Sequence, residues 1–283
     1  MPLHELLLPV LGLITGFVLG TLGSGGSALA LPAFVYAAGL PVKSAVATSL
    51  AVVGATSLVG ALLAKRRCHT HGCPGQEVDI RVALLFAVGG IAGSFGGARL
   101  AGLLSDRSQM LLFACVIAGA ATAMFRRKRE ESGAVPCEKT CAEWVIPFLG
   151  LGIGVLTGVV GVGGGFLFVP ALTLLAGIPM KRAASTSLWI IAANSATGVI
   201  GYLGHTPIAW GAAGLFLIMS ILGVLAGQHI CRTAKPQGLQ TAFAVFLVLV
   251  GTYTVARTLL VKKSAPGERS GSAAAPTPRT GNR

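Results

Sequence analysis

The chain repeats one apolar, glycine-broken segment after 138 residues. Residues 12–50 read GLITGFVLGTLGSGGSALALPAFVYAAGLPVKSAVATSL and residues 150–188 read GLGIGVLTGVVGVGGGFLFVPALTLLAGIPMKRAASTSL; without gaps, 18 of the 39 positions are identical. The identities include glycines, prolines, a lysine and a Thr-Ser pair, which shared hydrophobicity alone does not produce. A duplicated apolar unit, interrupted by glycines at the same place in both copies, is typical of transporters whose binding site lies between two halves.

The composition places the chain in a lipid bilayer. Hydrophobic residues make up 53% of the 283 residues and charged residues only 11%, too few charges to cover a soluble protein of this length. Eight apolar stretches recur, most of them close to the length of about 20 residues that a spanning helix requires. They cover residues 6–22, 44–64, 82–104, 110–125, 144–160, 183–203, 211–231 and 239–260. The sequence predicts an all-α integral membrane protein with about eight transmembrane segments in two homologous halves, each with a glycine-interrupted first segment.

The basic residues indicate orientation rather than nucleic-acid binding. The net charge of +13 is carried by loops and by the C-terminal tail. Basic clusters at residues 65–67 and 126–129 are separated by two crossings, so they share a side, which their charge predicts to be cytoplasmic. The predicted organisation is a first repeat, a cytoplasmic linker, a second repeat and a disordered basic tail. Their bounds are residues 1–125, 126–143, 144–261 and 262–283.

The glycine break leaves two membrane layouts open. The apolar run after each break has about 13 residues, too few to span a bilayer. Each repeat either begins with one long broken helix, giving eight crossings and parallel halves, or begins with a hairpin that enters and leaves on one face, giving three full crossings per half and inverted halves. Lys262 and Lys263 in the cytoplasm would favour the first layout, whereas Lys181 and Arg182 there would favour the second.

The breaks are the predicted substrate site. Inside a bilayer every backbone polar group needs a partner, so an interrupted helix is tolerated only beside protein or a water-lined cavity. Glycine lets a ligand approach the backbone, and a helix that restarts there directs N–H groups and its positive dipole end into the gap. An anion is the expected ligand; the alternative is that the glycines only allow close helix packing. The predicted substrate-binding residues are Gly25, Gly26, Ser27, Thr48, Ser49, Gly163, Gly164, Gly165, Thr186, Ser187 and Asn194.

The polar members of this set have structural alternatives. The paired Thr-Ser residues open long helices, where a hydroxyl can merely cap the backbone. Asn194 is costlier to bury. Lys43 and Lys181 correspond in the repeat and could draw anions or anchor at the interface, and an alignment of the later segments brings Arg99 opposite His229 near segment ends.

The paired breaks, the G-x-P-x-K strings and the A-T-S-L and S-T-S-L strings resemble the TauE/SafE family of sulfite and organosulfonate exporters over residues 6–260. The resemblance implies a multi-pass carrier of the bacterial inner membrane for small sulfur-containing anions such as sulfite, thiosulfate or organosulfonates. Its partners would be the anion and the lipid bilayer.

A hydrophilic insertion in the first half, CHTHGC, has no counterpart in the second half. It holds Cys68, His69, His71 and Cys73, whose spacing matches no standard zinc pattern. This spacing favours a surface loop without a function of its own. The second functional hypothesis is a membrane sensor or sulfur-relay partner that acts through this loop with a cytosolic sulfur-carrier protein. We expect no metal or cofactor.

Enzymatic activity is not expected. The chain has no GxxxxGK[ST] loop, and its nine acidic residues supply no membrane-embedded carboxylate dyad or catalytic triad. Transport would then be secondary, driven by the substrate gradient, the membrane potential or protons.

Overall fold

The computed structural model describes residues 3–71, 78–130, 145–161, 165–174, 177–203, 206–233 and 236–263, and these ranges consist of helices joined by short turns and loops, with no strand. Four helices are long and apolar enough to cross a membrane: Val42–Arg66, Ile80–Ala101, Met180–Tyr202 and Trp210–Ile230. Large hydrophobic side chains such as Val88, Phe148 and Leu249 are exposed on the outside, as lipid contact requires. The predicted all-α membrane class is confirmed.

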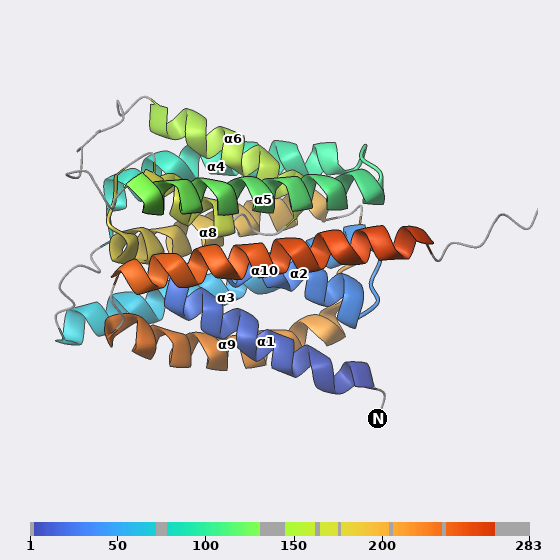
Figure 1. The fold of residues 1–283 in the computed structure, drawn as a ribbon, viewed down its shortest axis with the longest axis horizontal. Coiled ribbons are helices and arrows are strands. Elements are labelled where there is room, and N and C mark those ends of the chain that lie inside the picture. Colours follow the sequence, from blue (N-terminus) through green and yellow to red (C-terminus); the bar gives the residue numbers. More distant parts are fainter. Residues whose placement is uncertain are drawn as a thin grey trace, which may run out of the picture.

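The helices lie roughly along one common direction (Figure 1). In chain order they are α1 (Leu3–Leu22), α2 (Ser27–Pro32), the π-helix η1 (Ala33–Ala37), α3 (Val42–His71), α4 (Ile80–Ala101), α5 (Asp106–Glu130), α6 (Val145–Val160), α7 (Gly165–Leu174), α8 (Met180–Tyr202), α9 (Trp210–Thr233) and α10 (Pro236–Lys263). Helices α5 and α10 therefore extend a few residues beyond the repeat boundaries predicted at 125 and 261. The remainder of the predicted linker and tail, residues 131–143 and 264–283, lies outside the described residues.

The chain folds back on itself after α1. A Cβ atom at Gly26 would collide with the carbonyl of Thr15 and press on Leu19, so the residues that open α2 pack against the middle of α1. If the helix only bent and then continued in the same direction, Gly26 would lie far from Thr15. Helices α1 and α2 therefore form a hairpin, and glycine is required where their backbones touch.

The helix before each break packs against a helix of the other half. Helix α1 runs parallel to α9, and α6 runs parallel to α4, through contacts in which a glycine Cα lies against the opposite backbone. The contacts are Gly12 to Phe216, Gly16 to Ser220 and Gly20 to Val224 in the first pair, and Gly150 to Phe86, Gly154 to Gly90 and Gly158 to Ser94 in the second. Small residues are what allow such close approach between membrane helices.

Helices α3 and α8, which carry the two copies of the T-S-L string in their second and third turns, pack against each other and run antiparallel. Gly54 of α3 lies against Ser195, and Gly198 of α8 lies against Leu50. Because these helices occupy equivalent positions in the repeat, equivalent parts of the two halves point in opposite directions.

The basic clusters share one end of the bundle. Figure 1 places the C-terminal ends of α3 and α5 and the start of α8 at its left end, and the first residues of α1 and the end of α10 at its right end. A hydrogen bond from the Asp79 N–H, just before α4, to Thr186 Oγ1 of α8 joins the elements at the left end. Lys181 and Arg182 therefore lie at the end that carries the basic clusters, opposite Lys262 and Lys263.

Candidate functional site at the two glycine breaks

The two breaks have the same backbone conformation. Gly23 ends α1 with φ +79°, and its counterpart Gly161 ends α6 with φ +72°. Each glycine N–H closes the last helical turn, to the Leu19 carbonyl in one case and to the Thr157 carbonyl in the other, both at 2.8 Å. This is the left-handed residue that commonly ends a helix, and it favours glycine because a Cβ is costly there. A second equivalent pair, Gly39 and Gly177, has φ +65° and +66° after the short helices.

The breaks meet in the interior. The Phe166 N–H in the first turn of α7 donates to Ser27 Oγ of α2 at 3.2 Å. Ser27 Oγ in turn donates to the Ser24 carbonyl at 2.8 Å. A Cβ atom at Gly165 would lie 2.5 Å from Ser27 Oγ and 2.9 Å from the Ser24 oxygen, so no side chain fits there. Gly25, Gly26, Ser27 and Gly165 are thereby brought together, whereas Gly163 and Gly164 lie outside the described residues.

Ser24 is a site residue that the sequence reasoning missed. Its side chain is fully buried in the first break, and its hydroxyl has no hydrogen-bond partner. Burying a hydroxyl without a partner costs about 1–3 kcal/mol, so such a group calls for an explanation. The repeat did not indicate Ser24, because the equivalent residue in the second copy is Val162.

The predicted Thr-Ser pairs form hydrogen bonds between the halves. Ser49 Oγ donates to the Gly161 carbonyl at 2.5 Å and Ser187 Oγ donates to the Gly23 carbonyl at 3.1 Å. Thr48 Oγ1 accepts the Ala209 N–H at 3.1 Å, just before α9, and Thr186 Oγ1 accepts the Asp79 N–H at 3.2 Å, just before α4. The threonine hydroxyls therefore bind backbone N–H groups at helix starts, as in the alternative in which they only cap the backbone. Each threonine, however, binds at the start of a helix in the other half.

Asn194 is buried, with 1% of its surface exposed, and neither of its amide atoms has a partner. It sits on α8 against Gly90 of α4, where a Cβ would collide with the amide. Its backbone carbonyl accepts a hydrogen bond from Ser94 Oγ of α4 at 2.9 Å. Two equivalent serines, Ser57 and Ser195, are also fully buried with unpartnered hydroxyls. The two central helices therefore carry several polar groups that are free to bind.

The charged candidates lie away from these groups. Lys43 is half-buried and donates from Nζ to the Gly102 carbonyl at 3.3 Å, beyond the C-terminal end of α4. Arg99 is exposed, with its guanidinium 5.2 Å from the centre of the Phe95 ring, and His229 is exposed near the end of α9. No charged side chain is buried among the described residues. An anion that enters the interior would therefore meet polar groups and helix ends without a fixed negative charge among them.

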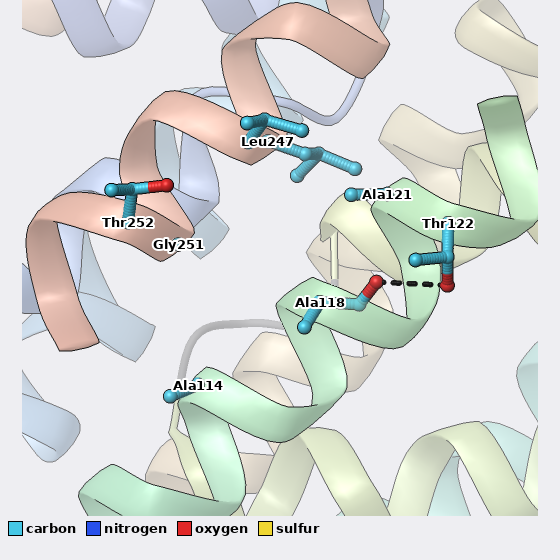
Figure 2. Close-up of a pocket in the computed structure, with 8 residues that line it drawn as sticks. Ala114, Ala118, Ala121, Thr122, Leu247, Gly251 and Thr252 are labelled. Carbon is cyan, nitrogen blue, oxygen red and sulfur yellow. Dashed lines mark hydrogen bonds between the residues drawn. The ribbon is translucent and has the colours of Figure 1, made fainter.

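A cavity of about 410 Å³ lies elsewhere, between α5 and α10 (Figure 2). It is lined by Ala114, Ala118, Ala121, Thr122, Leu247, Val248, Gly251 and Thr252. The Thr122 hydroxyl already donates to the Ala118 carbonyl of its own helix at 3.0 Å. The lining offers an anion almost no donors, so this cavity is not the candidate site.

The described residues contain no group of three or more His, Cys, Asp or Glu side chains that could hold a metal ion. The loop residues Cys68, His69, His71 and Cys73 are outside this finding, because the side chains of the first three and all of Cys73 lie outside the described part of the chain.

An apolar helical bundle in which two equivalent glycine breaks meet is typical of a multi-pass membrane protein of the transporter class. The chain matches the family described as "Sulfite exporter TauE/SafE" over residues 8–254 and belongs to that family. It is accordingly a membrane transporter.

Two bacterial relatives share this class over nearly their whole length. The chain is 28% identical over 257 residues to a "Probable membrane transporter protein" of Xylella fastidiosa, covering 87% of this chain and 93% of the relative. It is 27% identical over 268 residues to the "Probable membrane transporter protein YunE" of Bacillus subtilis, covering 87% and 95%. A 90-residue stretch is 39% identical to the "Sulfite exporter TauE/SafE family protein 5" of Arabidopsis thaliana, covering 31% and 20%. No solved structure matches the chain.

Proposed function

We propose that this protein is a secondary carrier that moves small sulfur-containing anions, such as sulfite, thiosulfate or organosulfonates, across the bacterial inner membrane. The observation that carries the proposal is the contact between the two breaks, where Ser27 Oγ of one half accepts a hydrogen bond from the Phe166 N–H of the other half. Membership of the TauE/SafE family supports the substrate class. A carrier site formed by both halves is what repeat transporters use.

The anion would bind at this meeting point. The ten-residue helix α7 directs its N-terminus there, and the positive end of its dipole favours negative charge. The Ser24 hydroxyl supplies an unused donor. Gly165 lets the first turn of α7 approach Ser27 closely, because a Cβ atom there would lie 2.5 Å from Ser27 Oγ. The contact surface would comprise Gly25, Gly26, Ser27 and Gly163 to Gly165, with the Asn194 amide as a further donor.

The membrane layout that we propose is an inverted repeat. Helices α3, α4 and α5 would cross the membrane in one half and α8, α9 and α10 in the other, while the segments α1–α2 and α6–α7 would form hairpins. The antiparallel course of α3 and α8 supports this layout. The end of the bundle with the clusters at residues 65–67 and 126–129 would face the cytoplasm, because basic residues concentrate there.

Flux through purified protein tests the function directly. The protein is reconstituted alone into liposomes, and uptake of labelled sulfite, thiosulfate and a sulfonate is compared with sulfate and chloride and with protein-free liposomes. We expect saturable uptake of at least one reduced-sulfur anion or sulfonate. Absence of flux for every such anion, with the protein inserted and folded, would reject the carrier function. Selective chloride flux would reject the substrate class.

The sensor or sulfur-relay hypothesis gains no support from the relatives, which are named as transporters. Flux in the absence of any cytosolic protein would separate the two hypotheses, because a relay needs its partner.

A further inference from the structure

The carbonyl groups of Gly23 and Gly161 leave their helices inside the protein and need partners there. Each glycine uses its N–H to close the helix before it, and its left-handed φ turns the chain away from the helix axis. A carbonyl released at this point cannot bond within its own helix. In the membrane interior an unsatisfied carbonyl costs several kcal/mol.

The partner comes from the other half in both cases. Ser187 of α8 donates to Gly23 of the first break, and Ser49 of α3 donates to Gly161 of the second. The donors are equivalent residues, the acceptors are equivalent residues, and both members of each pair are 138 positions from their counterparts. Two independent occurrences of one long-range bond exclude a chance contact.

Close packing accompanies each bond. A Cβ atom at Gly23 would collide with Ala184, and one at Gly161 would collide with Val46. Ala184 and Val46 are also equivalent, and each lies three residues before the serine on the same helix. One helical turn thus holds the glycine at two points, by a close packing contact and by a hydrogen bond.

The serine protons are already committed. Ser49 Oγ also lies 2.9 Å from the Val46 carbonyl of its own helix, and Ser187 Oγ lies 2.9 Å from the Ala184 carbonyl. A serine has one proton to donate, and here it faces two carbonyl oxygens. An anion needs donors, so these two hydroxyls are poor substrate contacts in this arrangement.

We infer that Ser49 and Ser187 are positioning residues, each of which fixes the glycine break of the opposite half and so sets the geometry of the site that the two breaks form. The hydrogen bonds stand independently of any substrate. Only the final step, from break geometry to anion binding, rests on the proposed function.

Hydrogen–deuterium exchange of the purified protein in lipid nanodiscs tests the inference without a substrate. Ser49→Ala should speed amide exchange by about 2- to 10-fold in peptides that include Gly161 and Phe166, the range expected for one ordinary hydrogen bond. Peptides that include Gly23 and Ser27 should change less than 2-fold. Ser187→Ala should give the reverse pattern. Ser185→Ala is the matched control, because the Ser185 hydroxyl bonds only to the Lys181 carbonyl of its own helix at 3.3 Å.

In this crossed pattern, each serine variant accelerates exchange at the break of the opposite half. A serine that only stabilised its own helix would not produce it. Equal acceleration in both breaks, acceleration only in the serine's own half, or no change in the opposite break would each overturn the inference. If an alanine variant is not recovered from membranes, Ser→Cys at the same position keeps the size and leaves only a weak donor. It should give the same crossed pattern at smaller amplitude.

A second measurement uses transport. Both alanine variants should raise the half-saturating sulfite concentration by about 2- to 10-fold, and Ser185→Ala should leave it unchanged. If exchange shows the crossed pattern but sulfite is not transported by the parent protein, the proposed substrate fails and the positioning role stands. If the parent transports sulfite but exchange is not crossed, the positioning role fails alone.

Discussion

Replacing Asn194 by leucine should stabilise the protein while impairing transport. The side chain is 1% exposed, and neither its amide oxygen nor its amide nitrogen has a partner. Leucine has nearly the same branched outline and carries no polar atom. Removing a buried unsatisfied polar group recovers about 1–3 kcal/mol of folding free energy. The variant should therefore have a higher melting temperature than the parent.

Transport should change in the opposite direction. If the Asn194 amide donates to the anion, its loss removes a hydrogen bond to a charged group, worth about 1.5–3 kcal/mol. This corresponds to roughly 10- to 150-fold weaker binding, since 1.4 kcal/mol is a factor of ten. The assay pairs thermal unfolding of the purified protein with sulfite uptake into liposomes at matched protein content.

The repeat supplies the control. Thr56 is the counterpart of Asn194 in the first half, and its hydroxyl donates to the Val52 carbonyl at 2.7 Å. Thr56→Val removes a satisfied group, so it should not stabilise the protein. Two outcomes would refute the reasoning on Asn194. A less stable Asn194→Leu variant would show that the amide is satisfied in the resting protein, and a stabilised variant with parental transport would show that the amide does not contact the substrate.

Three further perturbations test the breaks and the insertion. Gly161→Ala should lower the free energy of unfolding by more than the roughly 1–2 kcal/mol that an alanine in the left-handed conformation costs, because its Cβ would also collide with Val46. The control Gly119→Ala, which lies in open space on α5, should be neutral or slightly stabilising in thermal unfolding. Gly165→Leu should abolish sulfite uptake with insertion retained, and parental uptake would show that this glycine serves packing only. Joint replacement of the four Cys and His residues in CHTHGC should leave flux within a few-fold of the parent, under about 1.4 kcal/mol in barrier, and complete loss of flux would place the insertion in the mechanism.

The sequence predicted the position of the breaks but not the path of the chain through them. Identical glycines in two copies indicated a shared backbone requirement, and the left-handed φ of Gly23 and Gly161 confirms it. A bent helix and a hairpin both need such a glycine, so local pattern could not separate them. The contact of Gly26 with Thr15 separates them, and this contact depends on tertiary packing.

The site shows the same limit. The duplicated Thr-Ser pairs were visible in the sequence, but their partners lie 107 to 164 residues away in the other half, and no periodicity encodes such a pairing. Ser24 escaped attention because the repeat gives weight to matched positions, and its counterpart is a valine. Asn194 is equally unmatched, yet a buried amide is costly enough to be conspicuous in an apolar helix.

The unmatched positions give a physical reason why the two halves are not interchangeable. Around Asn194, helix α8 carries an amide where α3 carries Thr56, and the facing helix carries Gly90 where α9 carries Ser220. The glycine is required because any Cβ there would collide with the amide. A larger side chain on one helix is thus accommodated by the loss of one on its neighbour, which preserves close packing. The exchange leaves the duplicated framework intact and places two unpartnered amide atoms on α8 at the position where the Thr56 hydroxyl of α3 is already bonded. A symmetric scaffold can in this way hold a site that presents a different polar surface on each side of the substrate.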